Sequence, residues 1–88
     1  MEALPGGDLI QEGLRDLRRG VETTPALLVS IGEPRLRQLG FAVERPIPDP
    51  ELRLYGHLAA EESDAAHSRY NALIRRLVSF EHAAACVR

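Results

Sequence analysis

Lysine and tryptophan are both missing from this chain of 88 residues, and all 11 of its basic side chains are arginine. That bias is typical of GC-rich bacterial genomes and carries no chemistry by itself. The 13 acidic side chains outnumber the arginines and give a net charge of −2. A nucleic-acid-binding domain usually carries a basic excess, because its affinity comes largely from neutralised phosphates. The charge balance therefore argues against a nucleic-acid partner.

Cysteine and long apolar runs are also scarce. Cys86 is the only cysteine, so no disulfide can form within the chain, which fits a reducing compartment. No stretch approaches the ~18 apolar residues of a membrane span. The N-terminus has neither the basic start nor the long apolar run of a secretory signal. We therefore expect a cytoplasmic protein that makes no membrane contact.

Motifs that carry catalysis or hold a cofactor are absent as well. No serine lies in a nucleophile elbow, and the chain has no glycine-rich loop for phosphate. Asp64 and His67 have the spacing of a helical metal site, and His82 lies one turn before Cys86. Each of these pairs supplies only two ligands. We expect a protein that is not an enzyme, with no catalytic, cofactor-binding or metal-binding residues.

The C-terminal third holds the only sustained periodic pattern in the sequence. Between residues 63 and 88, apolar residues recur at alternating spacings of four and three: Ala66, Tyr70, Leu73, Leu77, Phe80, Ala84 and Val87. This spacing places all of them on one face of an amphipathic helix. Ser63 is a suitable N-cap, and the helix would be roughly 34 Å long.

The N-terminal part carries one clear helix with start and stop signals. Residues 1–7 are expected to form a flexible lead, because they end in glycine breakers. Asp8, with Gln11 three residues later, has the pattern of a capping box. The helix that follows would end at Gly20, the residue type that most often terminates helices.

The middle of the chain predicts shorter elements. Thr24 followed by proline is a helix start signal, but the apolar run 26–31 is too short for its periodicity to separate helix from strand. The cap favours a helix. A second short helix is expected over 35–39, ending at Gly40. Prolines at every second position then make 41–50 an extended connector.

The last start signal is Asp49, which precedes a proline and opens a helix that frays near Glu61. The chain is therefore expected to be all-α, with four or five helices forming a single domain over residues 8–88. The alternative is a small α+β fold in which 27–31 and 41–44 are strands.

The long C-terminal helix suggests the function. It is about twice as long as the first helix, so part of its apolar face is expected to meet a second protein chain. The predicted interface residues are Tyr70, Leu73, Leu77 and Phe80, with Arg69, Arg75 and Arg76 at the rim. Aromatic and arginine side chains are typical of interface anchors. We expect a non-enzymatic accessory or adaptor protein that acts by helix-mediated association, as a homodimer or with another protein.

The alternative is a small DNA-binding transcriptional regulator that uses residues 25–40 as a helix-turn-helix. Arg35 and Arg37 would then face DNA. The fit is poor, because the second helix is short, holds Pro34 in its first turn and begins with Glu33.

Overall fold

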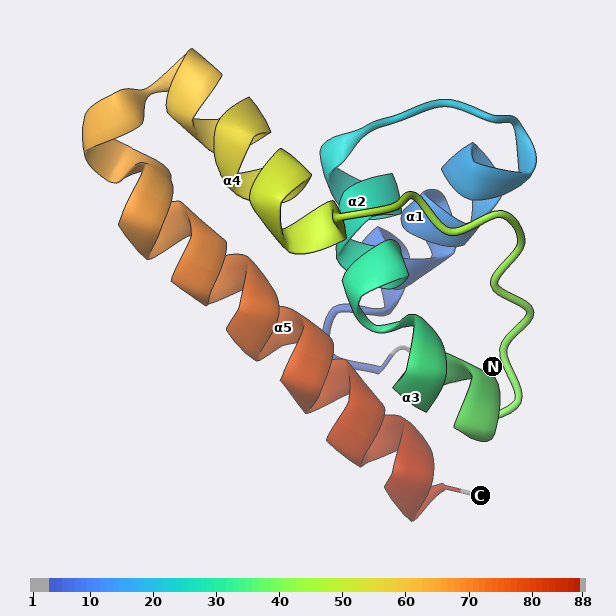
Figure 1. Ribbon diagram of the computed structural model, residues 1–88. Helices are drawn as coiled ribbons and strands as arrows, with labels where there is room; N and C mark the ends of the chain where they lie inside the picture. The colour runs from blue at the N-terminus through green and yellow to red at the C-terminus, as the bar shows by residue number, and fades with distance from the viewer. Residues whose placement is uncertain (1–3, 88) are drawn as a thin grey trace.

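A computed structural model describes residues 4–87 and shows an all-α fold (Figure 1). Helices hold 74% of the described residues, and no strand occurs among them. This confirms the all-α prediction and excludes the α+β alternative. The elements are α1 (Gly7–Arg18), α2 (Thr24–Ile31), α3 (Glu33–Gln38), α4 (Pro50–Glu61), the 3₁₀ turn η1 (Ser63–Ala65) and α5 (Ala66–Cys86).

Helix α2 lies at the centre of the molecule. It packs against α1, α4, α3 and α5, and α5 runs diagonally past the other helices in Figure 1. The side chains from Ala26 to Val29 are 0% exposed. A helix that is apolar on every side has to be surrounded in this way. The ambiguous run 26–31 is therefore helical because tertiary packing covers it on all sides.

The approach of α1 to α2 depends on Gly13. A Cβ atom at this position would lie 2.3 Å from the carbonyl oxygen of Pro25 and 2.8 Å from Cγ1 of Val29. Real Cβ atoms essentially never come this close to backbone oxygen. Only glycine allows the two helices to cross at this separation.

Glycine also ends α1 and α3, as the sequence predicts. Gly20 and Gly40 have φ angles of 72° and 97°, in the left-handed region. At the first of these ends, the amide of Gly20 donates to the carbonyl of Leu17, and the next amide donates to the carbonyl of Asp16. The second end has the same pair of bonds. Both are Schellman motifs, which satisfy carbonyl groups that the helix leaves open.

The predicted helix starts are less accurate. Helix α1 begins at Gly7 with Gly6 as N-cap, so Asp8 lies inside the helix and makes no cap. Helix α2 is capped by Thr23, one residue earlier than expected. Ser63 begins the 3₁₀ turn and caps nothing by its side chain. Of the expected flexible lead, residues 1–3 lie outside the described residues.

The connector 41–49 has no strand and is held against α2. The hydroxyl of Ser30 donates to the carbonyl of Ala26 at 2.8 Å and accepts the amide of Ile47 at 3.0 Å. Val43 is buried, while Ile47 packs against the core from its edge. The buried hydroxyl of Ser30 therefore helps to fix the path of a segment that has no regular secondary structure of its own.

Replacement of Gly13 tests the close crossing. Gly13→Ala should lower the free energy of unfolding by about 1–3 kcal/mol, because the added methyl group overpacks the core against backbone that cannot move aside. Urea denaturation followed by circular dichroism measures the change.

The matched control is Gly56→Ala in α4, where a Cβ atom would meet nothing within 4 Å. This substitution should stabilise the protein by about 0.5–1 kcal/mol, the usual helix-interior difference between the two residues. Unchanged urea midpoints for Gly13→Ala would contradict the crossing described here.

Candidate interaction site

Two of the predicted interface residues belong to the core. Leu77 is 3% exposed and Phe80 is 1% exposed. The ring of Phe80 lies against that of Phe41, with centroids 5.4 Å apart. The prediction held that the first helix is too short to cover the apolar face of α5 and that the other helices are short as well, whereas α2, α4 and Phe41 of the connector pack against it. In this conformation Leu77 and Phe80 are unavailable to a partner.

The other two apolar residues of the prediction are half-buried. The ring of Tyr70 packs against that of Tyr55 on α4, with centroids 5.8 Å apart. Burial raises the pKa of Tyr70, and the charge of Glu51 adds to this. Leu73 packs against the edge of the core. The ring of Tyr70 therefore joins α5 to α4, and both side chains leave only part of their surface for another chain.

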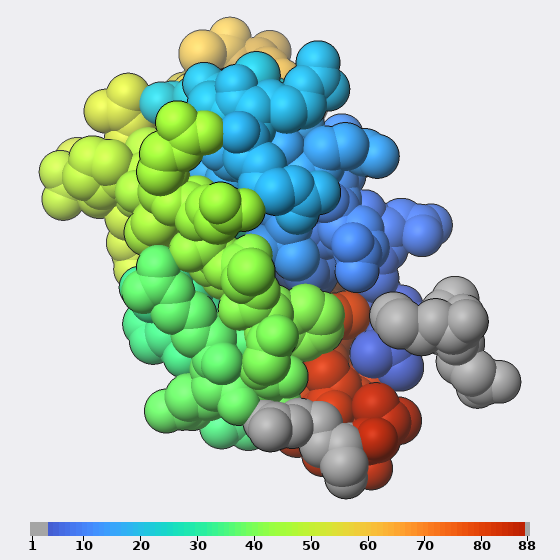
Figure 2. Space-filling view, turned by 90° about the vertical axis from the view of Figure 1, so that its right-hand side faces the viewer, coloured from blue at the N-terminus to red at the C-terminus, as the bar shows by residue number. Residues whose placement is uncertain are grey.

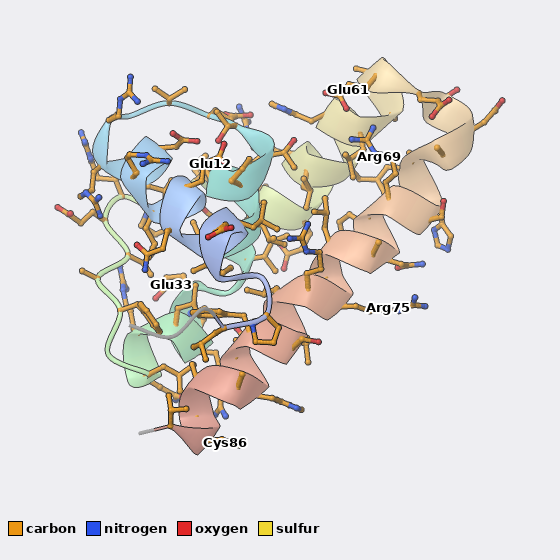
Figure 3. All side chains as sticks on the ribbon, turned by 180° about the vertical axis from the view of Figure 1, so that it is seen from behind. Glu12, Glu33, Glu61, Arg69, Arg75 and Cys86 are labelled. Atoms are coloured by element: carbon orange, nitrogen blue, oxygen red, sulfur yellow. The ribbon has the colours of Figure 1, made fainter. Side chains whose placement is uncertain are left out.

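The predicted rim arginines differ from one another. Arg69 pairs with Glu61 at 2.8 Å and so ties α5 to α4, as Figure 3 shows. Arg75 and Arg76 are exposed and form no ion pair with any residue in 4–87. In Figure 3, Arg75 projects away from the helix into solvent.

An apolar groove runs beside the buried face of α5, between this helix and α3. Its volume is about 320 Å³, and it is lined by Ile31, Gly32, Pro34, Arg35, Ile74, Leu77, Val78 and Glu81. Val78 is 41% exposed in the middle of the helix. Sequence spacing alone could not locate α3 beside Ile74 and Val78.

Glu81 is the only acid in this groove. Burial raises the pKa of its carboxyl group, and the positive charge of Arg35 offsets part of that rise. The two residues line the same groove, yet they form none of the ion pairs found in the described part of the chain. The groove thus presents one base and one acid that are not joined to each other.

A second cluster of charged residues connects the turn after α1 to α4. Arg53 donates to the carboxylate of Glu22 at 2.9 Å, and Nε2 of His57 lies 2.9 Å from the other oxygen of that carboxylate. The bond from Arg53 is the main reason why the pKa of Glu22 is lowered. Because 31 and 35 positions separate the partners, sequence spacing could not reveal this cluster. Arg53 and His57 on α4 both hold the carboxylate of Glu22, so this cluster links the turn after α1 to α4.

The sequence contains two pairs of possible metal ligands, Asp64 with His67 and His82 with Cys86, and neither pair is expected to hold a metal ion. Among residues 4–87, no group of three or more histidine, cysteine, aspartate or glutamate side chains could hold a metal ion. Cys86 is exposed at the end of α5 (Figure 3). None of the described helices combines the length and the apolar character needed to cross a bilayer.

The segment 25–40 offers little surface to DNA. Helix α2 is largely enclosed by its neighbours, and α3 has only six residues. Arg37 is held by Glu33 at 2.7 Å and by the carbonyl of Val43 at 2.8 Å. The geometry therefore provides no observation that favours the DNA-binding alternative.

Comparison of the chain with protein-family models, with curated proteins and with solved structures found no match.

The two shifted carboxyl groups give opposite pH dependences. The pKa of Glu81 is raised, so the folded state keeps its proton at pH values where the unfolded chain has lost it, and stability falls as pH rises through that window. Glu81→Gln should therefore raise the urea midpoint at pH 7 and leave it unchanged at pH values below the carboxyl range.

Glu22→Gln is the matched comparison, because the pKa of Glu22 is lowered. Its contribution to stability is present at pH 7 and is lost as pH falls through the folded-state value. This variant should lower the urea midpoint at pH 7. Changes of the same sign in both variants would contradict the assigned environments.

Proposed function

We propose that this chain is a non-enzymatic, cytoplasmic bacterial accessory or adaptor protein that associates with a second copy of itself through the groove between α3 and α5. The supporting observation is the apolar groove, in which Val78 is exposed beside half-buried Ile74 and Ile31. Apolar side chains that gather in one place on a small domain are typical of protein interaction sites.

The charges in the groove support a second copy as the partner. In a two-fold symmetric interface, residue i of one copy meets residue j of the other, and the reverse contact follows. Arg35 and Glu81 have opposite charges and do not pair within the chain. Across a two-fold axis, each Arg35 can pair with Glu81 of the other copy while the apolar walls pack together.

The interface has to extend beyond the groove. Stable pairs bury roughly 800 Å² on each partner. The whole chain exposes 5380 Å², so such an interface would cover a sizeable fraction of the surface. The part of α5 around Val78 and the outer face of α3 flank the groove and would supply the additional area.

Solution mass tests this proposal. At about 100 μM, light scattering should give the mass of a dimer for the parent chain, since transient pairs have micromolar affinity. Val78→Arg should shift the mass to that of the monomer. Leu52→Arg is the control, because Leu52 is 77% exposed on α4 and lies outside the groove; it should leave the dimer intact.

A charge exchange tests the pairing itself. Arg35→Glu should weaken the dimer by placing two acids in each groove, and the double variant Arg35→Glu, Glu81→Arg should restore it. A parent chain that stays monomeric contradicts self-association. A dimer that survives Val78→Arg places the interface elsewhere.

A further inference from the structure

Four arginines meet at the C-terminal end of α1. Arg15, Arg18 and Arg19 are exposed on its last turn and at its C-cap. Arg45 comes from the connector, 27 positions further on, and its Nη2 donates to the carbonyl oxygen of Arg18 at 2.7 Å. Two segments of the chain therefore bring their positive charges to one place, which we call the arginine patch.

No carboxylate of residues 4–87 forms an ion pair with the arginine patch, because the ion pairs in this part of the chain involve other basic side chains. Two acids near the patch in sequence are engaged elsewhere: Asp16 accepts the hydroxyl of Thr23 at 2.6 Å, and Glu22 is held by Arg53 and His57. The exposed Glu12 and Glu44, which flank the patch in sequence, form no ion pair with it.

The helix dipole accounts for only part of this arrangement. Cations are favoured near a helix C-terminus, which suits the three arginines of α1. Like charges spaced by three or four residues nevertheless repel each other. Arg45 in addition has a φ angle of 51°, in the left-handed region that is unfavourable for a residue with a side chain. Its side chain makes one hydrogen bond within the described residues, which leaves most of its five N–H donors free.

An apolar pocket adjoins the arginine patch. It has a volume of about 230 Å³ and lies between the turn after α1 and the connector, which run side by side in Figure 2 as light blue and yellow-green surfaces. Its walls are Leu17, Gly20, Val21, Glu22, Arg45, Pro46, Ile47 and Pro48. Val21 is 43% exposed. Arg45 belongs both to the patch and to the pocket.

We propose that the arginine patch and this pocket together bind a short acidic peptide segment of a partner protein. Aspartate or glutamate side chains of the segment pair with Arg15, Arg18, Arg19 and Arg45, and one of its apolar side chains enters the pocket beside Val21. This surface shares no residue with the groove between α3 and α5, so the inference does not depend on self-association.

The pocket walls favour a peptide over a nucleic acid. Single-stranded nucleic acids bind by stacking bases on aromatic side chains within a basic groove. Apart from Gly20 and the charged Glu22 and Arg45, the walls here are aliphatic or proline side chains, and none is aromatic. Arginine pairs bidentately with carboxylates, so free guanidinium groups beside an aliphatic pocket match an acidic segment that contains a leucine or a valine.

Fluorescence anisotropy with a labelled probe tests the proposal. The probe is a short peptide of aspartate and glutamate residues around a central leucine, and a second probe has serine in place of the leucine. The full chain should bind the leucine probe several-fold more tightly than the serine probe. Val21→Ser should remove that difference. Affinity for both probes should fall as salt rises, because the charges are exposed.

Two double variants with the same change in net charge identify the site. Arg15→Gln, Arg19→Gln should weaken binding by about fivefold or more, since each exposed ion pair contributes up to about fivefold in affinity. Arg75→Gln, Arg76→Gln should leave it unchanged, because these residues lie on α5. Circular dichroism of both variants verifies that they fold, as expected for exposed side chains.

Three results would overturn the proposal. The first is no anisotropy change with either probe up to about 1 mM protein, the weakest affinity of interest. The second is an equal loss of binding in the two double variants, which would indicate unspecific attraction. The third is that a labelled single-stranded oligonucleotide binds more tightly than the leucine probe and that, of the two double variants, only Arg15→Gln, Arg19→Gln weakens its binding. This result would make the patch a nucleic-acid site.

Discussion

The close crossing of α1 and α2 at Gly13 is the contact on which the remaining structure depends. With no Cβ atom between the helices, the carbonyl of Pro25 approaches α1 directly, and α2 becomes enclosed. The enclosed helix then serves as the wall for α4, α3 and α5. A change of side-chain volume at this crossing would therefore shift the neighbouring helices, because an interior packed as densely as an organic crystal has no spare volume to absorb it.

Polar bonds at the two ends of α2 fix the segments around it. At its start, Thr23 accepts the amide of Ala26 and donates to the buried Asp16, so the cap of α2 is joined to the end of α1. Towards its other end, Ser30 holds the connector. Both proposed interaction surfaces lie next to segments that these bonds position: the arginine patch beside the end of α1, and the groove beside α3. A rigid centre therefore carries the surfaces that face other molecules.

Sequence patterns located the elements more reliably than their starts or their neighbours. The stops at Gly20 and Gly40 were predictable, because few residues other than glycine adopt a left-handed conformation. Helix starts were harder, since several polar residues in a row can each serve as a cap, and tertiary packing selected Thr23 over Thr24. The buried stripe of α5 was visible in its spacing, but what covers Leu77 and Phe80 depends on contacts distant in sequence. The bond from Arg53 to Glu22 and the bond from Arg45 to the end of α1 likewise join residues that are distant in sequence.

The two glycines that end α1 and α3 determine which stereoisomer of a residue each position can accept. At Gly20 and Gly40 an added Cβ atom would meet nothing within 4 Å, so the left-handed φ angle, and not a lack of space, disfavours an L-residue there. A mirror-image residue prefers the opposite sign of φ. D-alanine at either position would therefore adopt the native φ angle without backbone strain and would restrict the unfolded chain, which is the means by which residues with fewer backbone states stabilise proteins. In both turns the preference for glycine is thus a matter of stereochemistry.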